Sequence, residues 1–233
     1  MTHCVKTIFY MPIREFPPIE YADENGLLAM GGDLHPLSLM LAYRNGIFPW
    51  PTEGIPLAWF SPPERAVLVF EELHIPRSLE RERKRSSLRF TIDQAFKAVI
   101  TACSTAHRPG QNGTWITPDM KEAYVDLHKA GFAHSLEAWQ DDKLVGGIYG
   151  VDVDGAFAAE SMFYEEPYAS KLALLALIDH LKARGGTWMD IQVMTPHMER
   201  LGGRVISREQ FLEALTQTRA QRLRLFGAEP GSR

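Results

Sequence analysis

The segment AHSLEAWQDDKLVGGIYGVDVDGAFAAESMF, residues 133–163, contains three runs of strand-forming residues separated by two short turn signals. Asp141-Asp142 and Asp154-Gly155 are turn signals of the kind that joins antiparallel neighbours. The segment therefore predicts a three-stranded antiparallel meander. Its strands cover about Ala133–Gln140, Leu144–Val153 and Ala156–Phe163.

Strand and helix signals alternate on both sides of this meander. Upstream we predict a strand at Ala66–Phe70, a basic helix at Pro76–Arg85 and a second strand at Leu88–Ile92. Two more helices follow, one from a cap at Asp93 to Cys103 and one from Thr117-Pro118 to Gly131. Downstream we predict an apolar helix at Ala169–Gly185 and a buried strand at Trp188–Val193. A short helix then begins at Thr195-Pro196, and a last helix begins at a capping box of Ser207 and Gln210. From Leu88 onward this order resembles the N-acetyltransferase (acyl-CoA) architecture, which predicts an α+β fold with a mixed sheet.

The region before the meander predicts a separate small domain. Pro36 and Gly46 bracket a short helix, and five prolines then fall within Ile47–Pro63, which predicts a rigid irregular linker. We therefore expect a small N-terminal domain over residues 1–62 and an acetyltransferase-like catalytic domain over residues 63–233. The linker also carries aromatic residues, which either plug a neighbouring surface or line a pocket, namely Phe48, Trp50, Trp59 and Phe60.

The composition is that of an ordinary globular protein. The chain has 233 residues, 45% of them hydrophobic and 23% charged, and its formal net charge is −4. No apolar run approaches the ~20 residues that cross a bilayer, and the amino terminus lacks the features of a secretory signal. Cys4 and Cys103 are the only cysteines, which argues against a disulfide framework. We expect a cytoplasmic monomer that does not bind a membrane.

One stretch is strongly basic despite the net negative charge. Residues 77–89 read RSLERERKRSSLR, with six basic residues against two glutamates. Such a cluster can hold phosphates, because each contact releases counterions from a nucleic acid. It can equally be a solvated helix face with ion pairs along the helix, and charge alone favours that interpretation.

The candidate chemical groups lie on two predicted strands. Strand periodicity places Trp188, Asp190 and Gln192 on one face, and Glu160 interrupts the small and apolar residues of FAAESMF. Buried polar groups are costly unless they are paired, so the Asp190 and Gln192 side chains either bond to specific partners or face solvent. If the two strands are neighbours, these groups converge and can handle an amine.

Several cofactor chemistries are disfavoured. The loop that would hold the coenzyme A pyrophosphate, Tyr164–Tyr168, has no glycine, two carboxylates and a proline. No CxxC or HExxH motif occurs and the eight histidines are scattered, so we expect no metal site. No GxSxG motif is present to begin a serine triad.

The chain closely resembles bacterial leucyl/phenylalanyl-tRNA–protein transferases from about Phe16 to about Arg222. The matching runs are NGLLAMGGDL (25–34), AYRNGIFPW (42–50), WFSPPERAVL (59–68), LHIPRSL (73–79), GTWIT (113–117), AYVDLHKAGFAHSLEAW (123–139), LVGGIYGV (144–151), ESMF (160–163), ASKLALL (169–175) and DIQV (190–193). The resemblance implies transfer of Leu or Phe, and less readily Met, from charged Leu-tRNA or Phe-tRNA to proteins that begin with Arg or Lys. The new amino terminus is a degradation signal, and the family uses no metal or coenzyme A.

The resemblance also implies roles for particular residues. Asp190 and Gln192 would orient and deprotonate the attacking amine, and Glu160 would hold an amino group of the substrates. The aminoacyl pocket would be lined by Trp50, Trp115, Ile148, Phe157, Leu177, Ser161 and Ser170, although Ile148 and Leu177 are equally compatible with a place in the core. The tRNA phosphates would contact Arg77, Arg81, Lys84 and Arg85.

Two other functions remain open. An acyl-CoA-dependent N-acetyltransferase would share the topology but would lack its usual loop. A noncatalytic RNA-binding module would use the basic helix but would not need Glu160, Asp190 and Gln192 together.

Overall fold

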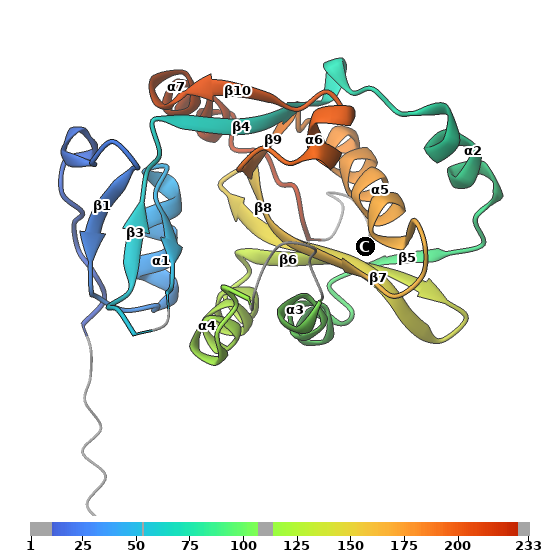
Figure 1. Ribbon diagram of the computed structural model, residues 1–233, viewed down its shortest axis with the longest axis horizontal. Helices are drawn as coiled ribbons and strands as arrows, with labels where there is room; N and C mark the ends of the chain where they lie inside the picture. The colour runs from blue at the N-terminus through green and yellow to red at the C-terminus, as the bar shows by residue number, and fades with distance from the viewer. Residues whose placement is uncertain (1–10, 53, 107–113, 228–233) are drawn as a thin grey trace, which may run out of the picture.

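The computed structural model describes residues 11–52, 54–106 and 114–227, and Cys4 lies outside these ranges. They form an α+β fold with two sheets, as the sequence predicts (Figure 1). The smaller sheet is antiparallel, in the order β1 (Leu27–Met30), β3 (Ala58–Phe60) and β2 (Phe48–Trp50). Helix α1 (Pro36–Arg44) connects β1 to β2, and the 3₁₀ turn η1 (Ile19–Tyr21) precedes β1.

The larger sheet has seven strands. In spatial order they are β10 (Arg204–Ser207), β4 (Glu64–Val69), β9 (Trp188–Gln192), β8 (Ala156–Tyr164), β7 (Lys143–Val153), β6 (Ala133–Gln140) and β5 (Arg89–Ile92). The remaining elements are η2 (Phe70–Glu72), α2 (Arg77–Arg85), α3 (Phe96–Thr105), α4 (Pro118–Lys129), α5 (Ala169–Ala183), α6 (Pro196–Arg200) and α7 (Arg208–Ala220). The predicted meander is confirmed as the antiparallel strands β6, β7 and β8. The β8–β9 pair is parallel, with α5 as its crossover, so the sheet is mixed.

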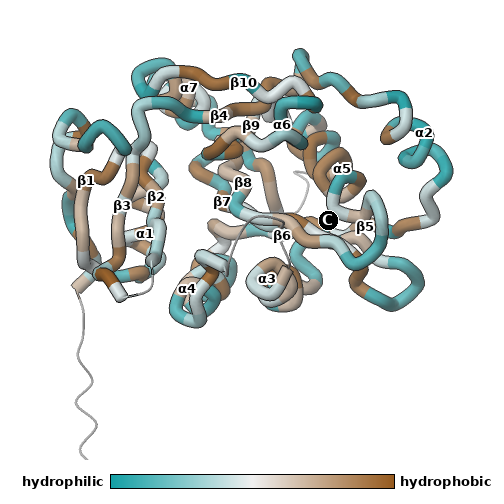
Figure 2. The backbone as a smooth tube through the Cα atoms, in the orientation of Figure 1, coloured by the Kyte–Doolittle hydropathy of each residue, from teal (hydrophilic) through white to brown (hydrophobic). Residues whose placement is uncertain are grey.

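The two faces of the larger sheet are covered by different helices. Helices α3 and α4 lie on one face and α5 on the other (Figure 1). The core divides accordingly: one apolar cluster joins α1, α3, α4 and α7, and the other joins α2, α5 and α6. Figure 2 shows α5 as mostly hydrophobic and α2 as mostly hydrophilic. None of the helices in the described ranges is both long and apolar enough to span a membrane.

The prediction of an irregular linker over Ile47–Pro63 is wrong, because β2 and β3 both lie in it. Pro49 is tolerated in β2 because β2 is an edge strand, where a missing N–H donor breaks no second ladder. The Trp59 side chain packs in the core beside the small sheet. It is 1% exposed, and its indole Nε1 donates to the carbonyl oxygen of Gly31 at 2.8 Å.

Asp93 does not cap a helix, which corrects the sequence prediction. Helix α3 begins three residues later with Ala95 at its N-cap, and Asp93 has a left-handed φ of 59°. The Asp93 carboxylate instead accepts from Ser135 N and bonds His134 Nδ1, at 2.9 and 2.7 Å. The other caps are confirmed at Thr117 and Thr195 and in the Ser207 capping box.

Candidate active site

Glu160 lies at an irregularity in β8. Along the β7–β8 ladder, Tyr149 pairs with Ser161 and Gly150 pairs with Ala159, so Glu160 is an extra residue between two pairs. This arrangement is a β-bulge, which bends a strand and re-aims a side chain. Only glycine fits at Gly150, because a Cβ atom there would lie 2.2 Å from the carbonyl oxygen of Ala158. The bulge therefore depends on the glycine opposite it.

Gln192 lies at a second irregularity, at the end of β9. Along the β4–β9 ladder, Ala66 pairs with Gln192 and Val67 with Asp190, so β9 also contains one extra residue. Gln192 has a φ of 58°, and Val193 N donates to the carbonyl oxygen of Ile191 at 2.7 Å across it. A three-residue turn with positive φ at its centre is rare and strained for a residue other than glycine.

These two irregularities open a cavity between β8 and β9. The parallel pairing of the described residues covers Phe157–Met189 and Ala158–Asp190, and Glu160 and Gln192 lie beyond it. Their side chains meet in the opening: Gln192 Nε2 donates to Glu160 Oε1 at 2.8 Å. The cavity has a volume of about 360 Å³, within the range of ligand pockets.

The walls of this cavity are mostly apolar. The indole rings of Trp50 and Trp115 belong to its lining and stack on each other, with centroids 5.9 Å apart and planes 19° from parallel. Trp50 keeps 37% of its surface exposed, which is high for an aromatic side chain in a packed domain. The remaining lining comes from β7, β8, β9 and the first turns of α5 and α6, and includes Ile148, Ser161, Met162, Ser170, Ile191 and Met198.

Two buried tyrosines continue the polar chain behind Glu160. The Tyr43 hydroxyl, from α1, donates to Glu160 Oε1 at 2.6 Å. It is also hydrogen-bonded to the hydroxyl of Tyr124, from α4. Since the Tyr43 proton points to the carboxylate, Tyr124 donates to Tyr43. Burial and the nearby Glu160 raise the pKa of both tyrosines well above the ordinary value, so both keep their protons.

Asp190 lies behind the cavity rather than in its lining. It is 4% exposed, and its carboxylate accepts from Arg65 Nη2 at 2.7 Å and from Arg65 Nε at 2.9 and 3.1 Å. The backbone N–H of Gln192 also donates to Asp190 Oδ1, at 2.8 Å. The expectation that Asp190 and Gln192 share a face therefore fails at the bulge, which turns only Gln192 into the cavity.

The protonation of Glu160 is shifted by its surroundings. Burial raises the pKa of its carboxyl from the ordinary value to about 7. Hydrogen bonds from Tyr43 and Gln192 and the charge of Arg65 oppose this rise, and the charge of Asp190 adds to it. Near pH 7 the Glu160 carboxylate can therefore both take up and return a proton.

The structure separates the predicted pocket residues into two groups. Trp50, Trp115, Ile148, Ser161 and Ser170 line the cavity. Phe157 and Leu177 are each 1% exposed and belong to the core cluster that contains α5, away from the lining. Leu177 shares a face of α5 with Ser170 but lies two turns further along the helix, beyond the residues that line the cavity.

Tyr43, Tyr124 and Arg65 were not singled out by the sequence. Each lies in a run that carries the family resemblance, namely AYRNGIFPW, AYVDLHKAGFAHSLEAW and WFSPPERAVL. Tyr43 follows the apolar residues of α1 and Arg65 precedes those of β4, whereas Tyr124 lies in a helix with many charged residues and gave no such signal. The hydrogen-bond partners of these three residues depend on tertiary contacts of α1, α4 and β4 with the strands β8 and β9, which the sequence alone does not show.

The basic residues predicted to contact tRNA lie on α2. Arg77, Arg81 and Arg85 are exposed, and no ion pair joins them to an acidic residue among the residues that the structure describes. Arg83 is bound to Asp179 of α5, and Lys84 Nζ lies 3.5 Å from Glu80 Oε1. The buried side chain of Leu79 and the Arg83–Asp179 pair fix the helix to the protein.

The loop before α5 presents carboxylates rather than a phosphate cradle. Glu165 and Glu166 are exposed, and Lys143 Nζ bonds Glu165 Oε2 at 2.9 Å. Tyr168 occupies the N-cap of α5 with a φ of 67° and makes no capping bond through its side chain. The loop thus offers negative charge where a coenzyme A pyrophosphate would need donors.

The fold gathers three potential metal ligands that are scattered in the sequence. Atoms of Asp93, His128 and His134 lie within 4.8 Å of one another. Their nitrogens already serve other contacts, since His134 Nδ1 bonds Asp93 and His128 Nδ1 bonds the carbonyl oxygen of Ala133 at 2.7 Å. The expectation of a chain without a metal site stays a prediction.

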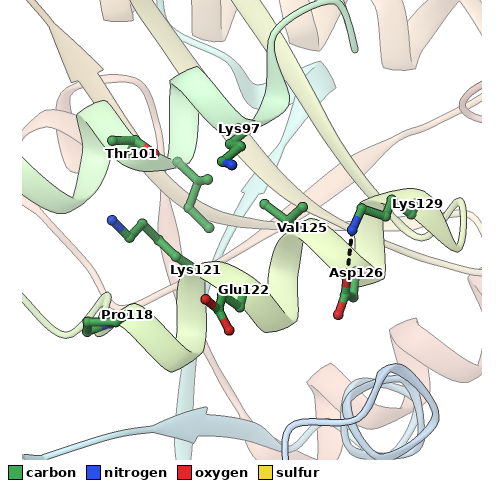
Figure 3. A pocket seen from close by; sticks show the side chains of 9 residues that line it. Lys97, Thr101, Pro118, Lys121, Glu122, Val125, Asp126 and Lys129 are labelled. Atoms are coloured by element: carbon green, nitrogen blue, oxygen red, sulfur yellow. Dashed lines mark hydrogen bonds and ion pairs between the residues drawn. The ribbon is translucent and has the colours of Figure 1, made fainter.

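A second hollow lies between α3 and α4, away from Glu160 and Gln192. Figure 3 shows Lys97 of α3 and Lys121 of α4 on its two sides, and the bond between Lys129 Nζ and Asp126 Oδ1, at 2.8 Å. None of the residues predicted to act in the reaction lines this hollow.

The fold and the cavity define an enzyme that handles an apolar group next to an amine. The apolar walls can accept an aliphatic or aromatic side chain, and the carboxylate and amide at the inner end can bind and deprotonate an amino group. A transferase between an acyl donor and an amine is the class that this combination describes.

Comparison with known proteins gives the particular family. Residues 67–216 match the model of leucyl/phenylalanyl-tRNA protein transferase, and residues 32–63 match that of its N-terminal domain. The leucyl/phenylalanyl-tRNA–protein transferase of Lawsonia intracellularis is 50% identical over 86% of this chain and 88% of its own length. The transferase of that name from Anaeromyxobacter sp. (strain K) is 47% identical over 97% of this chain and 99% of its own. The chain belongs to the leucyl/phenylalanyl-tRNA–protein transferase family.

One solved structure shows a distant likeness to this chain. A GCN5-related N-acetyltransferase-like protein from Streptococcus suis aligns with 62% of this chain and 57% of its own. The sequence identity is 12% and the TM-score is 0.35.

Proposed function

We propose that this chain transfers a leucyl or phenylalanyl group, and less readily a methionyl group, from aminoacyl-tRNA to the amino terminus of a protein. Membership of the family supports this function. The observation that carries it is the cavity whose apolar walls end at Glu160 and Gln192, which suits an apolar aminoacyl side chain next to a reacting amine.

In the proposed reaction the acceptor's α-amino nitrogen attacks the carbonyl carbon of the aminoacyl ester. The new C–N bond forms as the C–O bond to the terminal ribose breaks. Glu160 takes the proton from the amine and returns it to the leaving ribose oxygen. The ester is already activated, so positioning and proton transfer are the main demands on the protein.

The geometry supports a division of roles that differs from the one implied by the resemblance. Glu160 reaches the cavity and can exchange a proton near pH 7, whereas Asp190 is engaged with Arg65 behind it. We therefore assign proton transfer to Glu160 and orientation of the amine to the carbonyl oxygen of the Gln192 amide. Asp190 acts through the backbone of Gln192.

Trp50 and Trp115 would hold the aminoacyl side chain, with Ile148, Ser161 and Ser170 along the remaining wall. The exposed arginines of α2 would contact tRNA phosphates, since their charge is not neutralised by neighbouring carboxylates. This proposal places Lys84 in a lesser role, because Glu80 partly offsets its charge.

The partners and setting follow from the same reaction. Acceptors would be proteins that begin with Arg or Lys, which the transfer would mark for degradation, and the donors would be charged Leu-tRNA and Phe-tRNA. We propose that the enzyme acts as a monomer in the cytoplasm, without a cofactor.

We also propose that the chain divides into two domains, residues 1–62 and 63–233. The two sheets share no strand among the described residues, which supports this division.

The decisive experiment combines purified protein, radiolabelled Phe-tRNA and peptides that differ only in beginning with Arg, Lys or Ala. We expect label in the Arg and Lys peptides and none in the Ala peptide. Label in all three would contradict the acceptor rule. Absence of transfer with tRNA intact and bound would favour an RNA-binding module, and acetylation of the peptides from acetyl-CoA would favour an N-acetyltransferase.

A further inference from the structure

We propose that Arg65 is a positioning residue for the transfer reaction, which holds Gln192 and Glu160 in their working geometry through Asp190. The inference rests on the proposed function. Arg65 lies on β4, outside the cavity, and cannot touch a substrate there.

The guanidinium of Arg65 is buried between a carboxylate and two aromatic rings. It is 3% exposed, and two of its nitrogens bond the Asp190 carboxylate. Its Cζ atom lies 4.5 Å from the ring centroid of Phe48 and 4.6 Å from that of Phe211. A flat, delocalised cation fits between two aromatic rings while keeping its paired contact with a carboxylate, which an ammonium group does not.

These contacts join three parts of the chain at one ion. Phe48 comes from the small N-terminal sheet, Arg65 and Asp190 from adjacent strands of the larger sheet, and Phe211 from α7. A buried arginine whose carboxylate partner is removed is strongly unfavourable, and so is the carboxylate without its arginine. The pair therefore fixes where the end of β9 lies.

From Asp190 the chain of contacts reaches the cavity in two steps. Asp190 Oδ1 accepts the backbone N–H of Gln192 at 2.8 Å, within the strained turn that turns the Gln192 side chain towards Glu160. Gln192 Nε2 then bonds Glu160 Oε1 at 2.8 Å. Without Arg65 to orient the carboxylate, this turn loses the bond that offsets its strain.

The pair also balances charge around Glu160. The groups that act on Glu160 are Tyr43 of α1, Tyr124 of α4, Asp190 and Gln192 of β9, and Arg65 of β4. The tyrosines stay protonated, so the ionic influences come from the pair, in which Asp190 raises the pKa of Glu160 and Arg65 lowers it. Removing either partner alone leaves one uncompensated charge beside Glu160, of opposite sign in the two cases.

The test follows the titration of Glu160 directly by carboxyl ¹³C NMR, with Glu160→Gln used to assign its signal. Titrations are compared for the wild type, Arg65→Met, Asp190→Asn and the double variant. Arg204→Met is a matched control, since Arg204 forms its ion pair with Glu72 on the surface, at 3.0 Å. This readout needs no transfer activity, so failure of the positioning role and failure of the proposed function are distinguishable.

We expect the midpoint to rise in Arg65→Met, to fall in Asp190→Asn and to return close to the wild-type value in the double variant. The double variant should still lose about tenfold or more in kcat, because a neutral pair no longer orients Gln192. Arg204→Met should match the wild type. Equal midpoints in all variants, or shifts of the same sign in both single variants, would overturn the charge balance.

Arg65→Lys provides the second test, because a single variant that leaves a buried charge unpaired can fail to fold. Lysine keeps the charge but not the forked contact or the flat ring contacts. We expect kcat to fall about tenfold, with KM for Phe-tRNA and the Glu160 midpoint close to wild type. A kcat within twofold of the wild type would overturn the positioning role.

Discussion

The edge of the cavity and helix α2 are both built from charged and polar side chains, but in opposite ways. At the cavity, Arg65, Asp190 and Gln192 are at least 90% buried, and each bonds the next. On α2, Arg77 and Arg81 project into solvent from a helix that contains a single buried residue, Leu79.

This difference predicts how substitutions in each region affect the protein. Groups that share hydrogen bonds in a low-dielectric site act as a unit, so the loss of one displaces the others. Exposed charges act nearly independently and are screened by salt. The cavity edge should thus give large, non-additive effects on the chemical step, and α2 smaller, additive effects on binding.

The largest effect should come from Glu160→Gln. The variant keeps the shape of the side chain but removes the group that exchanges the proton, so kcat/KM should fall by about 10²- to 10⁴-fold. In the wild type, kcat/KM should rise with pH through about 7 as Glu160 ionises, because the base must be deprotonated. Transfer rates measured from pH 5.5 to 9 should show the inflection near 7 in the wild type only, while the rise caused by deprotonation of the acceptor's α-amino group, whose reference pKa is about 7.7–8.0, should remain in both. If the variant keeps both the rate and the inflection, Glu160 is not the base.

Gly150→Ala should come next, because the new Cβ atom would lie 2.2 Å from the carbonyl oxygen of Ala158 and 2.5 Å from the Phe157 ring. The β8 bulge must shift to make room, which moves Glu160 without changing it. A misplacement of about 1 Å costs roughly 10²-fold in rate, and we expect a fall in kcat of about that size. Quench-flow measurement of single-turnover transfer checks this. A normal rate would show that the cavity edge tolerates displacement.

Trp50→Ala should have an intermediate effect. The exposed indole contributes one wall of the cavity and its stacking contact with Trp115, together worth about 1–2 kcal/mol. We expect KM for Phe-tRNA to rise about tenfold with a smaller change in kcat. Steady-state kinetics with Phe-tRNA and Leu-tRNA would measure it, and equal KM values before and after the substitution would exclude Trp50 from the aminoacyl site.

The smallest effect at low salt should come from replacing Arg77, Arg81 and Arg85 together by alanine. Binding of tRNA should weaken a few-fold, and the slope of log K against log salt should fall by about two to three, one unit for each lost phosphate contact. Filter binding of charged tRNA across a salt series measures both.

Arg83→Ala provides the matched control on the same helix, because Arg83 is already bound to Asp179. It should change the salt slope by less than one unit. An unchanged slope in the triple variant would leave α2 as an ordinary solvated helix face.

The sequence anticipated much of the fold because its signals are local. The turn residues at Asp141-Asp142 and Asp154-Gly155 predicted the meander, and the caps at Thr117 and Thr195 act through neighbouring backbone N–H groups. It failed where a partner elsewhere in the chain decided the outcome. Asp93 has a good capping side chain but bonds Ser135 and His134 instead, and β2 forms in a proline-rich stretch because β3 lies beside it.

By itself the sequence determined the α+β class, the family and the residue types available for the reaction, since periodicity, turns and motifs are properties of consecutive residues. Only the tertiary structure decided which of those residues face the cavity. Period-two alternation predicts one face for Asp190 and Gln192, but a bulge adds a residue to β9 and another to β8, and bulges arise from pairing between strands. For the same reason, the pairing of Arg65 with Asp190 follows from the position of β4 beside β9 and not from the sequence around Arg65.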